Sequence, residues 1–595
     1  MRTSIATVCL SGGLAEKLHA CAAAGFDGVE IMDSDLVAAA ESPEEIRALC
    51  ARLGLTIDLF QPFRDFEGVT SELLADNLRR ARAKFEVMQR LGAEMVLLCS
   101  NVATATIADP EVAAEQLAAL ADVAAEYGIS IAYEALAWGK YVNDYRDAWR
   151  IVEKADRPNL GICLDSFHVL SRGHDPAEIE EIAADKLFFL QLADAPSMDM
   201  DVLSWSRHHR LFPGEGDFDL IRFLSHVMLA GYRGPLSLEV FNDTFRQTDT
   251  ARTAAHAIRS LRWLYDRTAA RHGWTELQID PPQPPRAIDF VEIAGEDLSG
   301  VEQTLEQLGF VFSGGHRTKA VHLWRAGRAN LILTEKPRAR DAHLAGIGFE
   351  VDDAASAARR AVSIGAPPVF RRTRSGDAEL PAVAAPDGTE IFWNSRTAAE
   401  SWLSEFEGGQ DADAHDLEGI IDHINVAYPW QEFDEAVLFN TSTLALDAEP
   451  PADVPGPLGL VRSQVMRTAD GAVRLAMNLA PPTAPLLPRH IAVRVDDAIG
   501  VARRARAAGL VFLNMPDNYY DDLEARFGLA PALLDELREL DLLYDQGADG
   551  AFVHFYTPVI GEIFIEIVER RGGYDGYGAA SAPVRLAAQR EHGKR

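Results

Sequence analysis

The first 275 residues alternate short apolar runs with longer stretches in which polar and apolar positions follow a helical period. One such stretch, "SPEEIRALCARLG" (42–54), starts with Ser-Pro-Glu-Glu, which is typical of a helix N-terminus, and ends on Gly54, a helix stop. Strand–helix units repeated in this way predict a parallel sheet, and eight of them in about 250 residues predict a (β/α)8 barrel of the α/β class. The predicted strands are "SIATVCL", "GVEIM", "TIDLF", "MVLLC", "ISIAYE", "LGICLD", "LFFLQL" and "PLSLEV".

The last four predicted strands end in side chains that carry oxygen, namely Glu134, Asp165, Gln191 and Glu239. The active site of such a barrel lies at the carboxyl ends of its strands, so these side chains are expected to converge. Three carboxylates held together repel one another unless a cation lies between them. All-oxygen ligation favours Mg²⁺, Mn²⁺ or a similar divalent ion such as Co²⁺. The alternative is that each residue caps a helix or pairs with an arginine at the rim.

His168 lies one helical turn beyond Asp165 and is predicted to be a general base acting beside the metal. The alternative role for His168 is to support a metal ligand. The loop "WSRHHRLFPGEGDFDL" (205–220) places two arginines and two histidines before a Gly-Glu-Gly turn, which suggests an anionic substrate. The candidate substrate-binding residues are Arg210, Arg64, Glu30 and Ser206.

The rest of the chain contains an internal repeat. Residues 287–398 include "AIDFVEIAGED", "HLAGIGFEVDDAASAARRAVSIGA" and "DGTEIFWNS", and residues 417–595 include "IIDHINVAYPW", "PRHIAVRVDDAIGVARRARAAGL" and "IGEIFIEIVER". Each copy has the order strand, strand–helix, strand. A proline-rich linker (276–286) and an acidic linker (399–416) separate these segments from the barrel (1–275) and from each other.

Only the second copy carries metal-ligand residues, namely His423, His490 and Glu566. Alignment of the two copies places Phe290, Gly346 and Asn394 at the corresponding positions of the first copy. Two histidines and a carboxylate on separate strands are the set expected for a non-haem Fe²⁺ ion, with Mg²⁺ as the alternative. We therefore expect a second divalent metal in the C-terminal copy.

Composition narrows the class of partner. Lys and Arg total 57 against 90 Asp and Glu, so the net charge of −33 repels nucleic-acid phosphates and anionic lipids. The N-terminus lacks the apolar core of a signal peptide, and no run approaches the roughly 18 apolar residues of a membrane span. We expect a cytoplasmic protein that binds neither nucleic acid nor membrane. Five cysteines without zinc-ligand spacing are interpreted as buried thiols.

The barrel motifs resemble a known superfamily. "GVEIM", "IAYEAL", "GICLDSFHVL", "FLQLADAP", "FPGEGDFDL" and "LSLEVFND" look like the xylose-isomerase-like sugar phosphate isomerases and epimerases. More narrowly, they are similar to bacterial 3-dehydroshikimate dehydratases over about 270 residues, a span that includes the four proposed ligands and His168.

The C-terminal half resembles the vicinal-oxygen-chelate superfamily of α+β βαβββ modules and, within it, 4-hydroxyphenylpyruvate dioxygenase. "DHINVAY", "RHIAVRVDD", "FLNMPDNYYDDLEARF", "LLYDQGADGAFVHFYTP" and "EIFIEIVERRGG" carry this resemblance. The chain departs from the dioxygenase pattern at His554, in "NLAPP" (478–482) and at Ser581-Ala582, positions that help to bind or enclose the substrate in that family. The resemblance therefore implies metal binding more strongly than it implies oxygenation of hydroxyphenylpyruvate.

A barrel fused to such a pair of modules resembles the fused bacterial 3-dehydroshikimate dehydratases. The resemblance implies loss of water from the small anion 3-dehydroshikimate to give protocatechuate, a step of quinate and shikimate catabolism. Three alternatives remain at this point: a sugar isomerase or epimerase, a C-terminal Fe²⁺ oxygenase as the main activity, or a C-terminal module that serves structure or homo-oligomer formation.

Overall fold

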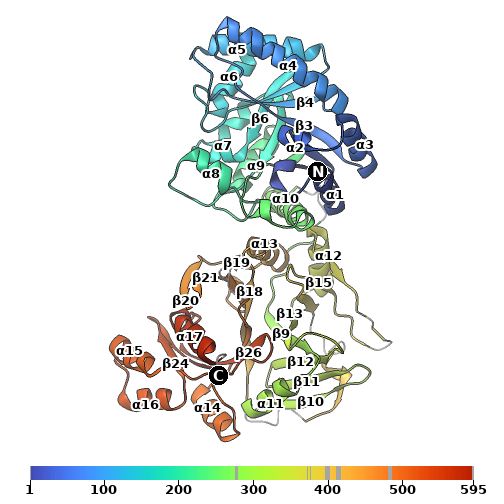
Figure 1. The fold of residues 1–595 in the computed structure, drawn as a ribbon. Helices are drawn as coiled ribbons and strands as arrows, with labels where there is room; N and C mark the ends of the chain where they lie inside the picture. Colours follow the sequence, from blue (N-terminus) through green and yellow to red (C-terminus); the bar gives the residue numbers. More distant parts are fainter. Residues whose placement is uncertain are drawn as a thin grey trace. The chain divides into compact units, whose positions relative to one another are not determined.

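The computed structural model describes residues 2–274, 279–371, 373–374, 377–395, 402–410, 417–479 and 486–592. The chain divides into two compact units, Met1–Gln278 and Ile279–Arg595 (Figure 1). Each unit has a large apolar core of its own. Among the described residues, no helix combines the length and the apolar character needed to cross a membrane.

The first unit is a closed barrel of eight parallel strands that pair in sequence order, β1 to β8, with β8 returning to β1. This confirms the predicted barrel. One predicted strand is shorter than expected: "SIATVCL" forms β1 only as far as Ala6, and Thr7–Cys9 form a 3-10 turn. The strands are β1 (Thr3–Ala6), β2 (Gly28–Met32), β3 (Thr56–Phe63), β4 (Met95–Cys99), β5 (Ser130–Glu134), β6 (Leu160–Asp165), β7 (Leu187–Leu192) and β8 (Leu236–Leu238).

Helices surround the barrel (Figure 1). In α3 the Ser42 hydroxyl accepts from the Glu45 N–H, while the Glu45 carboxylate accepts from the Ser42 N–H, and Gly54 ends the helix at φ 75°. The sequence signals for this helix are therefore confirmed at both ends.

All five cysteines are free and buried, as expected. The helices of this unit are α1 (Leu14–Ala24), α2 (Asp33–Ala38), α3 (Pro43–Leu53), α4 (Ser71–Leu91), α5 (Pro110–Ala125), α6 (Tyr145–Ala155), α7 (Ser166–Leu170), α8 (Val202–His208), α9 (Leu220–Leu229) and α10 (Thr250–His272).

The second unit contains two mixed sheets that repeat one topology. In the first sheet β9 pairs with β12 in parallel and with β13 antiparallel, and in the second sheet β18 pairs with β22 and β23 in the same two senses. This confirms the internal repeat. The strands of the first sheet are β9 (Ala287–Gly295), β10 (Val311–His316), β11 (Val321–Ala326), β12 (Ala329–Glu335), β13 (His343–Glu350), β14 (Pro368–Val369), β15 (Ala382–Ala384), β16 (Glu390–Asn394) and β17 (Phe406–Gly408).

The second sheet and the helices of both modules complete this unit. Figure 1 shows α11 and α14 beside the two sheets. The strands of the second sheet are β18 (Ile420–Tyr428), β19 (Asp447–Ala448), β20 (Ala452–Gly456), β21 (Gly459–Arg467), β22 (Arg474–Leu479), β23 (Arg489–Arg494), β24 (Leu543–Gln546), β25 (Gly550–Tyr556) and β26 (Ile563–Gly572). The helices are α11 (Ser299–Leu308), α12 (Ala354–Ile364), α13 (Phe433–Leu444), α14 (Ala498–Ala507), α15 (Asp517–Phe527), α16 (Pro531–Glu539) and α17 (Ala582–His592).

Strand register tests the alignment of the two copies. Phe290 pairs with Gly348 across β9 and β13, and His423 pairs with Ala492 across β18 and β23. Phe290 and His423 therefore occupy the same place in their sheets, as the sequence alignment predicted.

The third aligned pair is wrong. In the next strand Gly348 pairs with Phe392, whereas the equivalent Ala492 pairs with Glu566. Phe392, and not Asn394, therefore corresponds to Glu566. The similarity of "EIFWN" to "EIFIE" suggested the other match, but β16 and β26 are offset by two residues relative to their neighbours. Side chains of a strand alternate between its two faces with a period of two residues. An offset of two residues therefore keeps the same side chains facing inward, so the alternation of polar and apolar positions in the sequence does not reveal it.

Part of the stretch expected as an acidic linker has regular structure. Trp402–Glu405 forms a 3-10 turn, and β17 pairs with β10 at the edge of the first sheet. Residues 411–416 of that linker lie outside the described residues. The two modules share one apolar core, and the Arg360 Nε donates to the Ser442 carbonyl oxygen across it at 3.3 Å.

Candidate active site in the barrel and a second metal centre

The four proposed barrel ligands lie at the carboxyl ends of neighbouring strands. Glu134 and Asp165 are the last residues of β5 and β6. Gln191 pairs in register with Asp165 from β7, and Glu239 follows β8 directly. All four are at most 5% exposed. Successive strands of a closed barrel end on one rim, so the fold gathers side chains that lie far apart in the sequence.

Glu134, Asp165 and His168 offer ligand atoms that lie within 4.8 Å of one another. His168 Nε2 is 3.6 Å from Asp165 Oδ2 and 3.8 Å from Glu134 Oε1. Asp165 Oδ1 accepts from the Phe167 N–H at 2.6 Å and so caps the short helix α7. The apolar strand β6 ends in Asp165, which caps α7. This short helix in turn holds His168 over the rim of the barrel.

The guanidinium of Arg210 lies between two of the carboxylates. Nη1 donates to Asp165 Oδ2 at 2.7 Å and to Glu239 Oε2 at 3.1 Å. Nη2 lies 3.4 Å from His168 Nε2, and the Ser206 hydroxyl accepts from both Nε and Nη2. The donors of Arg210 are thus engaged by groups of the site itself, and Ser206 acts on the site through Arg210.

Glu30 lies against Gln191. Gln191 Nε2 donates to Glu30 Oε2 at 2.6 Å, and Gln61 Nε2 donates to the same oxygen at 2.8 Å. Ser237 Oγ donates to Glu30 Oε1. These bonds turn the amide nitrogen of Gln191 toward Glu30 and leave its Oε1 beside the Cys163 thiol at 3.6 Å. Glu30 therefore orients the carbonyl oxygen that Gln191 can offer to a metal.

Burial controls the protonation of this site. Burial raises the pKa of Glu134 well above its usual range, and repulsion by Glu239 and Asp165 adds to the rise. Burial also raises the pKa of Glu239 to about 7 against the opposing charge of Arg210. The pKa of His168 falls to about 3, chiefly because of burial, so its imidazole is neutral near neutral pH.

A divalent cation fits these residues. Arg210 pairs with only two of the three buried carboxylates, Asp165 and Glu239, and Glu134 Oε1 has no hydrogen-bond partner among the described residues. Uncompensated buried negative charge is costly, and a hard cation relieves that cost. The oxygen atoms available to hold it belong to Glu134, Asp165, Gln191 and Glu239.

A pocket beside these groups carries further positive charge. Arg64 and Arg207 line it together with His168 and Arg210. The buried Arg64 Nε has no hydrogen-bond partner among the described residues. The apolar part of the lining consists of Pro62, Leu97, Cys99, Leu136, Trp138 and Phe241. The pocket therefore combines an acidic part that fits a cation with guanidinium groups and apolar surface.

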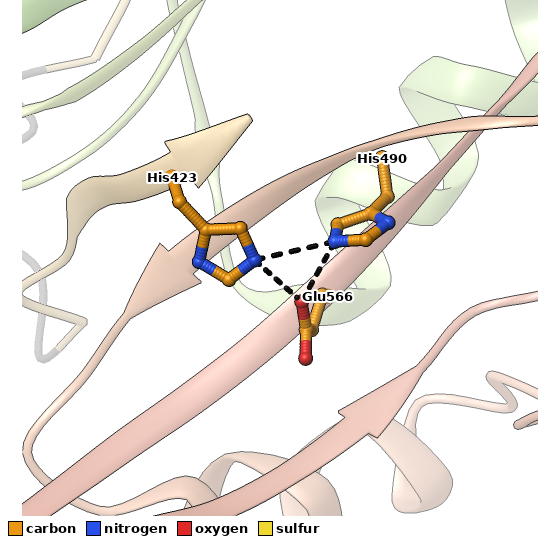
Figure 2. A group of neighbouring side chains, drawn as sticks. All are labelled: His423, His490 and Glu566. Atoms are coloured by element: carbon orange, nitrogen blue, oxygen red, sulfur yellow. Dashed lines mark hydrogen bonds and ion pairs between the residues drawn. The ribbon is translucent and has the colours of Figure 1, made fainter. Parts of the chain in front are cut away.

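The second candidate centre lies in the C-terminal module, where β18, β23 and β26 each supply one side chain (Figure 2). His423 Nε2 is 3.2 Å from both His490 Nε2 and Glu566 Oε2. His490 Nε2 is 3.1 Å from the same carboxylate oxygen. All three ligand atoms thus point at one another, as the two-histidine, one-carboxylate set requires.

Supporting contacts orient these ligands. Asp422 Oδ2 is 2.8 Å from His423 Nδ1, and Arg570 binds both oxygens of Asp422 at 2.7–2.8 Å. His554 Nδ1 is 2.7 Å from the Glu566 oxygen that faces away from the histidine pair. Although burial favours the neutral acid, hydrogen bonds from the three histidines hold the pKa of Glu566 well below its usual range. A carboxylate behind a ligand histidine is a typical feature of metal sites, so this set fits a divalent cation.

Aromatic side chains fill the corresponding place in the first module. Phe290 stands where His423 stands, with its ring centroid 5.6 Å from that of Phe392 and 5.1 Å from that of Trp402. Asp289 accepts from the side-chain nitrogens of Asn394 and Trp402. The first copy keeps the scaffold and replaces the ligands by packing.

A third group of candidate ligands is internally satisfied. His316, Asp377 and Glu405 have ligand atoms within 4.8 Å of one another. However, His316 Nε2 is 2.8 Å from Glu405, His316 Nδ1 accepts from the Thr318 N–H, and Lys319 pairs with Asp377 at 3.0 Å. This cluster already contains its own cation, so it is an ion-pair network.

Comparison with known proteins covers both units. Residues 18–267 match the xylose isomerase-like TIM barrel family, and residues 280–404 match the N-terminal region of hydroxyphenylpyruvate dioxygenase. A 3-dehydroshikimate dehydratase of Pseudomonas aeruginosa is 44% identical over 627 residues, and one of Pseudomonas putida is 42% identical over 621 residues. Each alignment covers 99% of this chain and 98% of the relative.

The chain belongs to the 3-dehydroshikimate dehydratase family. Both alignments run through nearly the full length of each protein, so family membership extends over both units. A solved structure described as a xylose isomerase-like TIM barrel/4-hydroxyphenylpyruvate dioxygenase fusion protein agrees, with a TM-score of 0.87 at 39% identity. It covers 100% of this chain and 99% of that one.

The sequence analysis did not identify several residues that contact the two candidate centres, namely Asp422 and Arg570 in the C-terminal module and Gln61 in the barrel. Asp422 directly precedes a proposed ligand, and that adjacency was a usable signal. Arg570 lies 148 positions from its partner Asp422, and Gln61 lies 31 positions from Glu30, so nothing local in the sequence indicates either pairing.

Of the positions at which the chain departs from the dioxygenase pattern, Ala480, Pro481 and Pro482 lie outside the described residues.

Proposed function

We propose that the barrel site converts 3-dehydroshikimate to protocatechuate and water. Membership of the dehydratase family supports this reaction. The structural observation that supports it most is the buried cluster of Glu134, Asp165 and His168 at the carboxyl ends of the strands. Glu134 and His168 also line a pocket that contains the guanidinium groups of Arg64, Arg207 and Arg210. Such a site can bind a small oxyanion and move a proton without competition from bulk water.

The proposed cofactor of the barrel is one divalent ion, Mg²⁺, Mn²⁺ or Co²⁺, held by Glu134, Asp165, Gln191 and Glu239. When bound, such an ion polarises a carbonyl group and stabilises negative charge that develops on its oxygen. The chain's own contribution is to place these donors on adjacent strands and to exclude water from them. Arg210, tied to Asp165 and Glu239, holds two of the donors in position.

His168 is the proposed proton acceptor. Its ring is neutral near neutral pH, and Nε2 faces the carboxylate cluster. Nδ1 accepts from the Ala137 N–H at 3.2 Å, a contact that keeps the single ring hydrogen on Nε2. For Nε2 to take a proton from substrate, the ring must carry its hydrogen on Nδ1. The mechanism therefore requires the Ala137 contact to open when substrate binds.

The substrate carboxylate is assigned to Arg64 in this proposal. Arg210 already donates to Asp165, Glu239 and Ser206, whereas Arg64 lines the pocket with a buried Nε that has no partner among the described residues. A free guanidinium fork matches a carboxylate in two parallel hydrogen bonds. Arg210 is thus a positioning residue, and Arg64 is the residue that meets the anion.

The proposed chemistry balances as a loss of water. His168 removes a proton from the carbon beside the ketone, and the electron pair delocalises into the carbonyl group. The C–O bond of the β-hydroxyl then breaks, and that oxygen leaves as water after it receives a proton. Tautomerisation of the remaining ring gives the aromatic catechol acid, which makes the reaction effectively irreversible.

A product assay tests the proposal and its main alternative. Protein loaded with Mg²⁺, Mn²⁺ or Co²⁺ is incubated with 3-dehydroshikimate, and the product is identified by chromatography and ultraviolet absorbance. One protocatechuate for each substrate consumed, lost in Glu134→Ala, is the expected result. A folded, metal-loaded protein that gives no protocatechuate but interconverts sugar or inosose ketoses would move the assignment to an isomerase.

The proposed C-terminal centre holds a second divalent ion, Fe²⁺ or Mg²⁺, between His423, His490 and Glu566. The three ligands come from three strands, so a bound ion would cross-link the centre of the sheet. This proposal assigns the centre a binding role and leaves turnover to the barrel.

A further inference from the structure

A groove lined by cationic side chains adjoins the catalytic pocket of the barrel. It has a volume of about 730 Å³, and its charged lining consists of Asp33, Arg64, Arg79, Arg80, Lys84 and Arg207. All but one of these side chains are cationic, although the chain as a whole has a net charge of −33. Arg64 and Arg207 also line the pocket that contains His168. A cleft lined by charges of one sign attracts small molecules of the opposite charge.

Helix α4 supplies one wall of this groove. Arg80, Ala83, Lys84 and Val87 all line it, and their spacing is that of one face of a helix. Arg80 and Lys84 are four residues apart on this face, and like charges at that spacing destabilise a helix. An anion bound between the two side chains would remove this cost.

Arg80 is held in place by neutral groups. Its Nη1 donates to Asn77 Oδ1 at 2.8 Å, and its Nη2 donates to the Arg64 carbonyl oxygen at 3.3 Å. Its guanidinium carbon lies 5.2 Å from the ring centroid of Phe63. No carboxylate of the described residues forms an ion pair with Arg80. The guanidinium is therefore positioned at the groove with its charge not offset.

The other cations of the groove are also poorly compensated. Lys84 Nζ lies 3.7 Å from Asp33 Oδ2, which is longer than a hydrogen bond. The guanidinium carbon of Arg207 lies 5.5 Å from the ring centroid of Phe241, and no carboxylate of the described residues pairs with it. Asp33 thus faces several positive charges alone, and the groove keeps an excess of positive charge.

We propose that this groove is a second anion site of the barrel unit, which takes a small dianion with several oxygens and holds it between Arg80 and Lys84. Arg79 is not assigned to the site because it already pairs with Asp76 at 2.7 Å. A phosphate group and a dicarboxylate share the required chemistry, because charge-assisted hydrogen bonds from arginine and lysine suit both.

An anion in the groove would also compete with the substrate of the barrel. Arg64 lines both the groove and the catalytic pocket, so a dianion bound at its guanidinium would occupy donors that the substrate carboxylate needs. This competition rests on the proposed function, which assigns Arg64 to the substrate. Binding of the dianion does not rest on it.

Calorimetric titration of the full-length, Mg²⁺-loaded protein tests binding without turnover. Sodium phosphate and sodium succinate are titrated at constant ionic strength, with chloride as the compensating anion. The variants are Arg80→Gln, the charge-retaining Arg80→Lys, and Lys84→Gln, with metal content measured in each. Arg82→Gln is the matched control, because it removes one positive charge from the same helix at an exposed pair with Glu126.

The expected result is saturable binding of at least one dianion. Arg80→Gln should weaken it at least about tenfold, the loss expected for one charge-assisted hydrogen bond. Lys84→Gln should weaken it by a smaller factor, because Asp33 offsets part of the Lys84 charge. Arg80→Lys should recover part of the loss, and Arg82→Gln should bind like wild type. In the protocatechuate assay the same dianion should raise KM and leave kcat unchanged, with a smaller rise in Arg80→Gln.

Two outcomes would overturn the proposal. If neither dianion binds, or if Arg80→Gln and Lys84→Gln bind it as tightly as wild type, the groove is not an anion site. If the bound dianion lowers kcat without raising KM, it does not share Arg64 with the substrate. A wild-type protein that forms no protocatechuate would instead overturn the proposed reaction, and calorimetry would still decide the anion site.

Discussion

Arg210 Nη1 lies 2.7 Å from Asp165 Oδ2, and both side chains are buried inside the barrel. Removal of one partner from a buried ion pair costs about 3–5 kcal/mol, because the other charge is left without compensation. Arg210→Met should therefore lower the melting temperature of the metal-free protein strongly. Added Mn²⁺ should restore part of the loss, because a cation among the carboxylates replaces the missing guanidinium charge.

Thermal melts with and without Mn²⁺ check this prediction. Arg79→Gln is the control, because it removes an exposed pair with Asp76 on α4 and should leave both melts unchanged. A melting temperature that falls equally in the presence and absence of metal would mean that Arg210 stabilises something other than the carboxylate cluster.

Glu30 is predicted to set the affinity of the barrel metal through Gln191. Glu30→Gln replaces the carboxyl group that accepts from the Gln191 amide at 2.6 Å by an amide, so the carbonyl oxygen of Gln191 loses its fixed orientation. Metal affinity should fall roughly 10–100-fold, the range found when groups behind metal ligands are changed. Titration with Mn²⁺ in a His423→Ala background isolates the barrel site. Glu44→Gln, on the exposed surface of α3, is the matched control, and unchanged affinity in Glu30→Gln would refute the orienting role.

Arg64 is predicted to bind the substrate carboxylate. Arg64→Gln should raise KM about tenfold or more with a smaller change in kcat, because a group remote from the reacting bond contributes mainly uniform binding. Steady-state kinetics with wild type, Arg64→Gln and Arg207→Gln measure this. A larger effect of Arg207→Gln would transfer the assignment to Arg207, which lines the same pocket.

Asp422 is predicted to support the second centre through His423. Asp422→Asn weakens the 2.8 Å contact to His423 Nδ1, so metal affinity at this centre should fall roughly 10–100-fold while protocatechuate formation is unaffected. Metal analysis and the dehydratase assay on one preparation check both parts. Asp575→Asn, at a half-exposed ion pair with Arg467 and Arg474, serves as the control. Loss of dehydratase activity in Asp422→Asn would contradict the separation of the two sites.

The sequence predicts the barrel and its ligand-bearing rim because both follow from local patterns. Strand and helix periods repeat in order, and the residue that ends each strand can be found by counting. Asp165 and His168 could be placed together for this reason, since one helical turn separates them.

Other features depend on register and distance, which a single sequence does not encode. The sequence alignment matched Glu566 to Asn394, whereas strand register matches it to Phe392. The two residues could be confused because an offset of two residues keeps the same face of a strand inward. The ties of Arg210 to Asp165 and of Arg570 to Asp422 join residues that are 45 and 148 positions apart. Glu30 was expected to bind substrate, and only the side-chain contacts place it against Gln191.

Turnover by a histidine variant that retains metal tests the barrel mechanism most directly. Metal-loaded His168→Asn is compared with wild type for protocatechuate formation, with metal content and substrate affinity measured on the same preparations. Because His168→Asn removes a positioned base, we expect kcat to fall about 10²–10⁴-fold. Metal content and substrate affinity should be unchanged. Near-native turnover in His168→Asn would contradict the assignment of His168 as the group that removes the proton.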